Sequence, residues 1–128
     1  MGDGKHIKIV GEGDPFRLGN VTVIDTFLKE VVALLKMRSL SGPHLCDVAF
    51  DIKRLGAEPF EDEGGVTGVI VLSTSHVAIH TWPLRKWFVL DVYSCRDFAT
   101  EDLSHYVQGF LGTERVRISD LSDSLSII

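Results

Sequence analysis

Reactive side chains are concentrated in one short segment of the chain, Ser73–Pro83. Three hydroxyl residues and two histidines fall within its first eight positions, with Ser75 directly before His76 and five residues before His80. A serine hydroxyl near an imidazole base can act as a nucleophile, so this segment is the first candidate for catalysis. The plain alternative is a strand with a few partly buried polar residues that do no chemistry.

Three familiar kinds of site do not fit the sequence. On a helix, His76 and His80 would share one face and could bind a metal ion. On a strand that rises about 3.3 Å per residue they lie roughly 13 Å apart, so the sequence predicts no metal site. Ser75 lacks the flanking glycines of a hydrolase nucleophile elbow. The segment Gly11–Gly13 lacks the third glycine of a dinucleotide-binding loop and is expected to be a turn.

The pattern of apolar residues predicts the elements that must hold the reactive segment. Apolar residues at a spacing of three to four predict a helix from Thr22 to Leu35, begun by a capping box and closed by Gly42-Pro43. The same spacing predicts a second helix with Thr100 as its N-cap and Gly112 as its stop. Alternating or continuous apolar runs predict strands at residues 5–10, 45–52, 66–72, 77–82, 87–95 and 116–118.

These elements predict an α+β fold. The connections between neighbouring strands are too short for parallel crossovers, so the sheet is expected to be mainly antiparallel. Each helix has one apolar stripe, which favours a two-layer α/β sandwich with the helices on one face. In a regular strand Ser75 and His80 point to opposite faces, so either the strand bends near Ser75 or the preceding loop turns its hydroxyl inward.

The composition is that of an ordinary globular protein. The 128 residues are 45% hydrophobic and 24% charged, which excludes a disordered tail and favours one domain spanning residues 1–128. The net charge of -5 argues against a general nucleic-acid binder. No apolar run is long enough to span a bilayer, and the N-terminus lacks the apolar region of a signal peptide. Because Cys46 and Cys95 are too few for a disulfide framework, we expect a soluble cytoplasmic protein without membrane partners.

Four motifs follow one another with fixed spacing: Gly65-Val66-Thr67-Gly68, Thr74-Ser75-His76, Ile79-His80-Thr81-Trp82-Pro83-Leu84 and Asp91-Val92-Tyr93-Ser94-Cys95. They resemble the Gly-Val-Ser-Gly, Glu-Ser-His, Ile-His-Thr-Trp-Pro-Glu and Asp-Val-Phe/Tyr-Thr-Cys motifs of the prokaryotic S-adenosylmethionine decarboxylases. The spacing of the reactive serine, histidine and cysteine is also that of the family.

This resemblance implies a proenzyme that cuts itself between Thr74 and Ser75. The Ser75 hydroxyl would attack the carbonyl of Thr74 to form an ester, and elimination would then break the chain into residues 1–74 and 75–128. Residue 75 would become a pyruvoyl group, which is the cofactor of the family. We expect the cut bond to be strained, because an unstrained peptide carbonyl is a poor electrophile for a hydroxyl.

The resemblance also assigns roles to other residues. It implies that His80 assists processing, that Thr67 supports processing, and that Cys95 donates a proton during decarboxylation. The pyruvoyl ketone at Ser75 would form a Schiff base with the amine of a small amino-acid substrate, and the protein would supply orientation. The family forms homodimers with active sites near the interface, so a homodimer is expected here.

Thr67 and Thr74 differ from the family residues, but the two more serious departures concern substrate contacts. Leu84 stands where the family has a glutamate that binds the substrate ribose. The loop that carries the adenine-stacking aromatic residue in the family reads Phe60-Glu61-Asp62-Glu63 here. Phe60 is a candidate for the aromatic contact, and Glu61, Asp62 and Glu63 could receive a cationic substrate. The plain alternative for this acidic run is a solvated loop.

The default expectation is a decarboxylase of S-adenosylmethionine that feeds polyamine synthesis. A first alternative is a pyruvoyl-dependent decarboxylase of a basic amino acid, arginine or ornithine. A second alternative, from a different functional class, is a relative that never processes itself and acts as a non-catalytic binding subunit.

Overall fold

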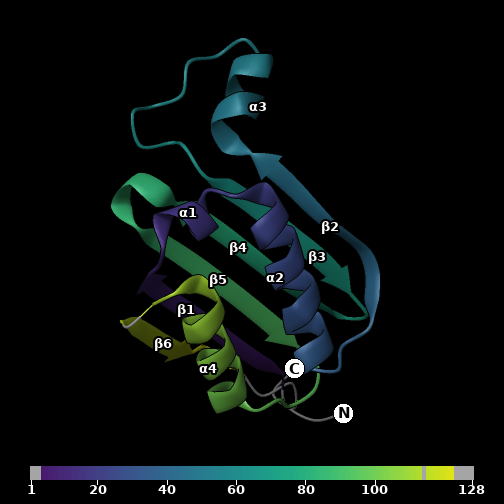
Figure 1. Ribbon diagram of the computed structural model, residues 1–128. Coiled ribbons are helices and arrows are strands. Elements are labelled where there is room, and N and C mark those ends of the chain that lie inside the picture. Colours follow the sequence, from purple (N-terminus) through teal and green to yellow (C-terminus); the bar gives the residue numbers. More distant parts are fainter. Residues whose placement is uncertain (1–3, 114, 123–128) are drawn as a thin grey trace.

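One antiparallel sheet with helices on one face organises the chain (Figure 1). The computed structural model describes residues 4–113 and 115–122. The strand order is β2-β3-β4-β5-β1-β6, and all neighbouring pairs are antiparallel. The strands are β1 (Lys5–Glu12), β2 (Ser39–Asp47), β3 (Val66–Leu72), β4 (Ser75–Trp82), β5 (Trp87–Ser94) and β6 (Val116–Asp120).

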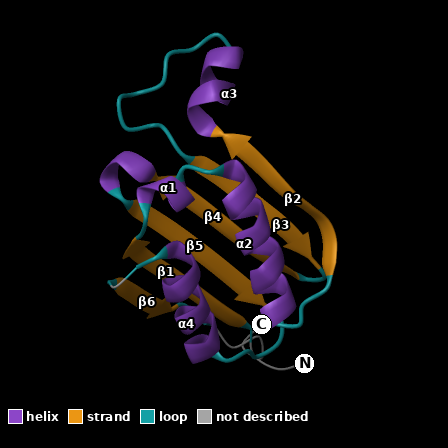
Figure 2. Cartoon of the chain, viewed as in Figure 1, coloured by secondary structure: helices purple, strands orange, loops and turns teal. Residues whose placement is uncertain are grey.

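Three of the helices lie on the same side of the sheet, and a fourth extends from the end of β2 (Figure 2). The three are α1 (Pro15–Leu18), α2 (Val21–Leu34) and α4 (Thr100–Leu111), and the fourth is α3 (Val48–Arg54). A short 3-10 turn, η1 (Pro83–Arg85), joins β4 to β5. The predicted two-layer α+β sandwich is therefore confirmed.

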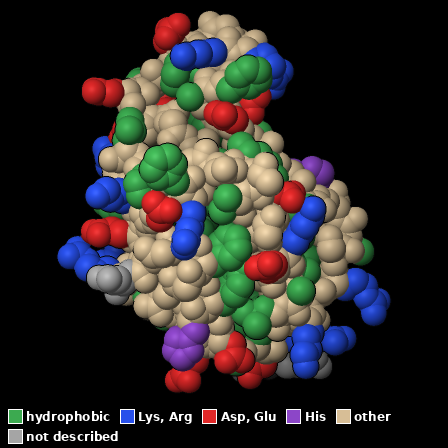
Figure 3. Space-filling model, in the orientation of Figure 1, with side chains coloured by type: hydrophobic (Ala, Val, Ile, Leu, Met, Phe, Trp, Pro, Cys, Tyr) green, Lys and Arg blue, Asp and Glu red, His purple; other side chains and the backbone are tan. Residues whose placement is uncertain are grey.

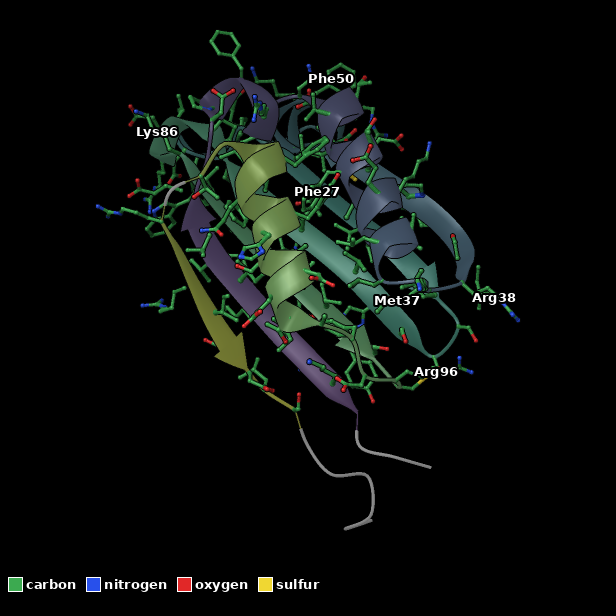
Figure 4. The ribbon with its side chains drawn as sticks, turned by 60° about the horizontal axis from the view of Figure 1, so that its bottom comes forward. Phe27, Met37, Arg38, Phe50, Lys86 and Arg96 are labelled. Carbon is green, nitrogen blue, oxygen red and sulfur yellow. The ribbon has the colours of Figure 1, made fainter. Side chains whose placement is uncertain are left out.

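The core lies between the sheet and helices α2 and α4. Along β4 the side chains of Val77 and Ile79 are fully buried beneath the helices, whereas His80 is exposed on the opposite face, which we call the outer face. Phe27 of α2 is also fully buried and its ring lies 5.5 Å from that of Phe110 on α4, so the two helices meet through aromatic packing (Figure 4).

The strands around the reactive segment form as the sequence predicts. Strand β3 has the predicted bounds, and β4 and β5 form the predicted hairpin with only a short connection at η1. However, β4 begins at Ser75, two residues before its predicted start, and β5 ends at Ser94. Gly112 ends α4 in a left-handed conformation, with φ +65°, as predicted for a helix stop. The N-cap of α4 is Ala99 rather than the predicted Thr100, which is the first residue of the helix.

The predicted strand at residues 45–52 is wrong in its second half. Strand β2 ends at Asp47, and α3 begins at Val48. The Asp47 side chain accepts a hydrogen bond from the backbone N–H of Phe50 at 3.3 Å, which caps the new helix. Val48 and Ile52 are spaced for a helix face as well as for a strand face, so alternation alone did not distinguish the two.

Helix α2 and its surroundings also differ from the prediction. The N-cap is Asn20, whose side chain accepts a hydrogen bond from Val23 N–H at 3.1 Å, so the predicted capping box from Thr22 is wrong. Gly42-Pro43 does not close this helix. It lies within β2, where Gly42 has φ +103° and the register with β3 shifts.

Acidic and basic side chains are intermixed on the face that carries the helices (Figure 3). This distribution agrees with the modest net charge of -5. Among the described residues, no helix has the length and apolar character needed to cross a membrane.

The close approach of Gly65 to β4 gives a stability prediction. A Cβ at Gly65 would lie 2.1 Å from the carbonyl oxygen of Thr81, whereas a Cβ at Gly64 would meet nothing within 4 Å. Gly65→Ala should therefore lower the free energy of unfolding by about 1–3 kcal/mol, because backbone must move to admit the methyl group. Gly64→Ala is the matched control and should unfold at the wild-type urea concentration. Equal unfolding midpoints for the two variants would contradict this packing.

Candidate active site

A tight turn joins β3 to β4 at the bond that the sequence singles out. Leu72 pairs with Ser75 in the ladder, so the turn contains only Ser73 and Thr74. Thr74 has φ +57°, a left-handed conformation that a β-branched residue rarely adopts. Holding a residue other than glycine there costs about 1–3 kcal/mol. The expected strain is thus found on the residue whose carbonyl Ser75 would attack.

The turn meets the end of β5, and this contact brings three of the predicted residues together. The Thr74 hydroxyl lies 2.9 Å from Cys95 Sγ and 2.6 Å from the Ser73 carbonyl oxygen, so its one proton is shared between these two acceptors. The backbone N–H of Cys95 donates to Ser75 Oγ at 3.3 Å. β4 and β5 are paired from His76 with Tyr93 to Trp82 with Trp87, so the ladder ends next to these contacts and holds the two chain segments close together.

The surroundings of Cys95 favour its thiolate. The hydrogen bond from the Thr74 hydroxyl is the main cause that lowers the pKa of Cys95 below its ordinary value. Desolvation opposes this effect, and the hydrogen bond with Ser75 and the charge of Arg96 add to it. A thiol with a lowered pKa exchanges its proton more readily near neutral pH, as a proton donor must.

An open hollow of about 610 Å³ lies beside Cys95. Its size is within the range of sites that hold small molecules. Basic and acidic side chains both contribute to its wall. The lining residues are Gly4, Lys5, Cys95, Arg96, Asp97, Asp120 and Ser122.

Thr67 and His80 are not part of this cluster. They pair with each other across β3 and β4, and Thr67 Oγ1 lies 3.0 Å from His80 Nδ1 on the outer face. His80 is five residues from Ser75, or about 16 Å along the strand. Ser75 shares the parity of buried Val77, so the two residues also belong to opposite faces, as the alternation predicts.

The loop with Phe60 lies at the same end of the sheet as His80, since it leads into the start of β3. Figure 4 shows the two ends of the sheet: Arg96, next to Cys95, is far from Lys86, which follows the turn at the other end. The structure therefore does not place the acidic run beside Ser75 of the same chain.

Two carboxylates of the acidic run already have partners. Asp62 forms an ion pair with Arg85 at 2.6 Å. Glu63 accepts a hydrogen bond from the backbone N–H of Phe60 at 2.8 Å. These contacts favour a structural role for both residues. The Phe60 ring is 77% exposed, and Leu84, in place of the family glutamate, is 72% exposed.

Two features of this region were not predicted from the sequence. The first is the contact of the Thr74 hydroxyl with Cys95, since the resemblance gives a role to the Thr74 carbonyl alone. The second is a cluster of His6, His76 and Asp91 on the outer face, in which both imidazoles contact one carboxylate. Only His80 was considered as a metal-binding partner of His76. Because His76 lies an even number of residues from exposed His80 on β4, the sequence could have placed it on the outer face. The sequence could not show its partners, because His6 and Asp91 lie on other strands.

The family-model comparison and the structural comparison point to the same family. The family model described as S-adenosylmethionine decarboxylase matches residues 10–123. A solved structure described as the adenosylmethionine decarboxylase from Aquifex aeolicus superposes with a TM-score of 0.71 at 25% sequence identity. That alignment covers 93% of this chain and 88% of the other.

Curated relatives match over shorter segments. An S-adenosylmethionine decarboxylase proenzyme of Methanococcus maripaludis is 43% identical over 58 residues, which cover 44% of this chain and 48% of that protein. An arginine decarboxylase proenzyme of Caldivirga maquilingensis is 38% identical over 71 residues, which cover 56% of this chain and 48% of that protein. The chain thus spans about half the length of the curated relatives it matches.

The contact between Thr74 and Cys95 gives a prediction about thiol reactivity. Thr74→Val keeps the β-branched shape but removes the hydroxyl donor, so the pKa of Cys95 should rise. Alkylation of Cys95, followed by mass spectrometry across a pH series, should reach half its maximal rate at a higher pH than in the parent. Both proteins carry Ser75→Ala, so that the Thr74–Ser75 bond is intact.

Two controls accompany this measurement. Cys46 in the same protein is an exposed internal reference whose pH dependence should not change. Thr74→Ser keeps the hydroxyl and should retain the parental profile at Cys95. If the valine and serine variants gave the same profile, the hydrogen bond would have no effect on the thiol.

Proposed function

The chain belongs to the S-adenosylmethionine decarboxylase family, and we propose that it is a self-cutting proenzyme that acts as a pyruvoyl-dependent decarboxylase. The proposed catalytic unit is one domain, residues 1–128, cut into residues 1–74 and 75–128. The observation that carries the proposal is the left-handed backbone of Thr74 in the two-residue turn before Ser75. The neighbouring Cys95 thiol and the open hollow beside it support the same conclusion.

Processing begins when Ser75 Oγ attacks the carbonyl carbon of Thr74. A C–O bond forms and the C–N bond breaks, while the hydroxyl proton is transferred through a base to the departing nitrogen, leaving an ester. Loss of the Cα proton of residue 75 then expels the Thr74 carboxylate, which ends the first fragment. The dehydroalanine that remains takes up water and loses ammonia. The strain at Thr74 favours the first step, because it is relieved when the peptide bond is lost.

The residues around position 75 fit a pyruvoyl group. Such a group is built from the chain and supplies a ketone that binds the substrate amine and accepts the electrons released with carbon dioxide. The hollow next to Cys95 has room for an amino-acid substrate. Cys95, with its lowered pKa, is proposed to return a proton to the substrate carbon.

We propose that the working unit is a homodimer in which His80 acts on Ser75 of the other copy. Within one chain the two residues are separated by about 16 Å of strand and belong to opposite faces of the sheet. Thr67 orients the His80 ring through Nδ1, so it supports processing indirectly. A second copy of the chain can present this pair to Ser75, whereas rearrangement within one chain would disrupt the paired strands.

S-adenosylmethionine is the proposed substrate, in a reaction that would serve polyamine synthesis. The matching family and the Methanococcus maripaludis relative support this choice. The exposed Phe60 ring is proposed to contact the adenine from the same end of the sheet as His80. Arginine is the competing candidate because one relative is named an arginine decarboxylase proenzyme. The pairing of Asp62 with Arg85 weighs against a cation site in that loop.

The first test measures whether the chain is cut and whether it releases carbon dioxide from a substrate. Purified wild-type protein should separate on denaturing gels into fragments of residues 1–74 and 75–128, and should release carbon dioxide from S-adenosylmethionine faster than from arginine or ornithine. Ser75→Ala should abolish both cutting and turnover, because the nucleophile is lost. Ser73→Ala, in the same turn, is the matched control and should still be cut. A wild-type chain that stays whole would support a non-catalytic relative instead.

The second test asks whether His80 acts between copies. His80→Ala and Ser75→Ala proteins should each remain uncut when expressed alone. When the two are expressed together, random pairing should place about half of the His80→Ala chains in mixed dimers, and those chains should be cut. A pair of variants that stays entirely uncut, although gel filtration shows mixed dimers, would assign His80 to its own chain.

A further inference from the structure

A second cluster of metal-ligating side chains lies on the outer face of the sheet, apart from the Thr67–His80 pair. His6 Nε2 lies 2.8 Å from one carboxylate oxygen of Asp91, and His76 Nε2 lies 2.7 Å from the other. All three ligand atoms lie within 4.8 Å of one another. The side chains are about one third exposed, so solvent reaches them.

The pairing of three neighbouring strands builds this cluster. His76 of β4 and His6 of β1 both pair with Tyr93 of β5, so the two imidazole rings lie 6.0 and 5.9 Å from the Tyr93 ring and 6.4 Å from each other. Asp91 lies two residues before Tyr93 on the same strand and is therefore diagonal to both histidines. Its neighbour on β4 is Ala78, whose small side chain leaves space beside the carboxylate.

We propose that His6, His76 and Asp91 form a binding site for one divalent first-row transition metal ion, with Zn²⁺ as the representative. Two imidazole nitrogens and one carboxylate oxygen are ligands that zinc accepts, and water can complete the coordination. The central strands hold the three donors close together before an ion arrives. Shifts of less than about 1 Å would bring each donor to the usual distance of about 2.0–2.2 Å from an ion.

The proton balance of binding is simple. Each imidazole that now donates from Nε2 to Asp91 must give up that proton and carry its single proton on Nδ1 instead. Asp91 needs no change of protonation near neutral pH. Partial burial, the largest single effect, raises the pKa of Asp91, but the hydrogen bonds and Coulombic interactions with His76 and His6 together leave the pKa below its ordinary value.

The donor set also predicts which ions bind. Imidazole suits Zn²⁺, Co²⁺ and Ni²⁺, whereas Mg²⁺ and Ca²⁺ prefer sites built from oxygen ligands only. One carboxylate with two imidazoles should therefore bind Zn²⁺ and should not bind Mg²⁺ at similar concentrations. This site does not include Ser75 or Cys95, so it does not depend on self-cutting or on decarboxylation.

The test is a calorimetric titration of chelator-treated full-length protein with Zn²⁺ and, separately, with Mg²⁺. Wild-type protein and the uncut Ser75→Ala protein should each bind one Zn²⁺ per chain. His6→Gln and Asp91→Asn should each weaken binding by more than about 100-fold, since the loss of even an outer-shell partner costs 10–100-fold. His105→Gln, an exposed histidine on α4, is the matched control and should bind as the wild type does.

A second measurement uses the wild-type protein and therefore does not depend on whether the variants fold. Addition of Zn²⁺ should shift the ring nitrogen NMR signals of His6 and His76 and leave those of His105 in place. The proposal is overturned if the wild-type protein binds no Zn²⁺, or if folded His6→Gln and Asp91→Asn proteins bind it unchanged. It is overturned equally if Mg²⁺ binds as tightly as Zn²⁺.

Discussion

The two-residue turn between β3 and β4 is the constraint on which the proposed chemistry depends. Antiparallel pairing of Leu72 with Ser75 leaves only two residues to reverse the chain, and Thr74 takes the left-handed conformation as a result. The same pairing holds the turn against the end of β5, where Cys95 contacts both Thr74 and Ser75. The strain at Thr74 and the contacts of Cys95 with Thr74 and Ser75 therefore depend on this one turn of the sheet. A longer or more flexible loop would relieve the strain at Thr74 and loosen the contacts of the turn with Cys95.

The paired strands of the sheet also keep His80 away from Ser75 within one chain. Paired strands cannot fold back to bring His80 to Ser75, so one chain does not bring these two residues together. The proposed association of two copies would resolve this separation without distorting either sheet. It also gives the outer face a role, since His80 and the cluster around Asp91 both lie there. The proposed processing and the proposed metal binding thus both use side chains on the outer face, which the core does not bury.

Sequence patterns predicted the parts of the fold that local residues determine. The apolar runs predicted β3 and the β4–β5 hairpin. The motif spacing supported the family resemblance, but the contact of Ser75 with Cys95 came from the structure. The prediction of one strand over residues 45–52 was wrong because the spacing of their apolar residues also fits a helix. The Asp47 side chain caps helix α3 and so ends the strand. The cluster of His6 with Asp91 joins residues 85 positions apart. Nothing in the spacing along one strand could reveal it, because register between strands is a property of the assembled sheet.

The most direct test of the central claim is chemical trapping of a ketone at residue 75. Wild-type protein treated with phenylhydrazine is separated into its fragments, and the intact mass of each fragment is measured. We predict that the fragment beginning at residue 75 gains the mass of one hydrazone, whereas the fragment ending at Thr74 and the Ser75→Ala chain gain nothing. A cut fragment that begins with an unmodified serine amine and takes up no reagent would contradict the account.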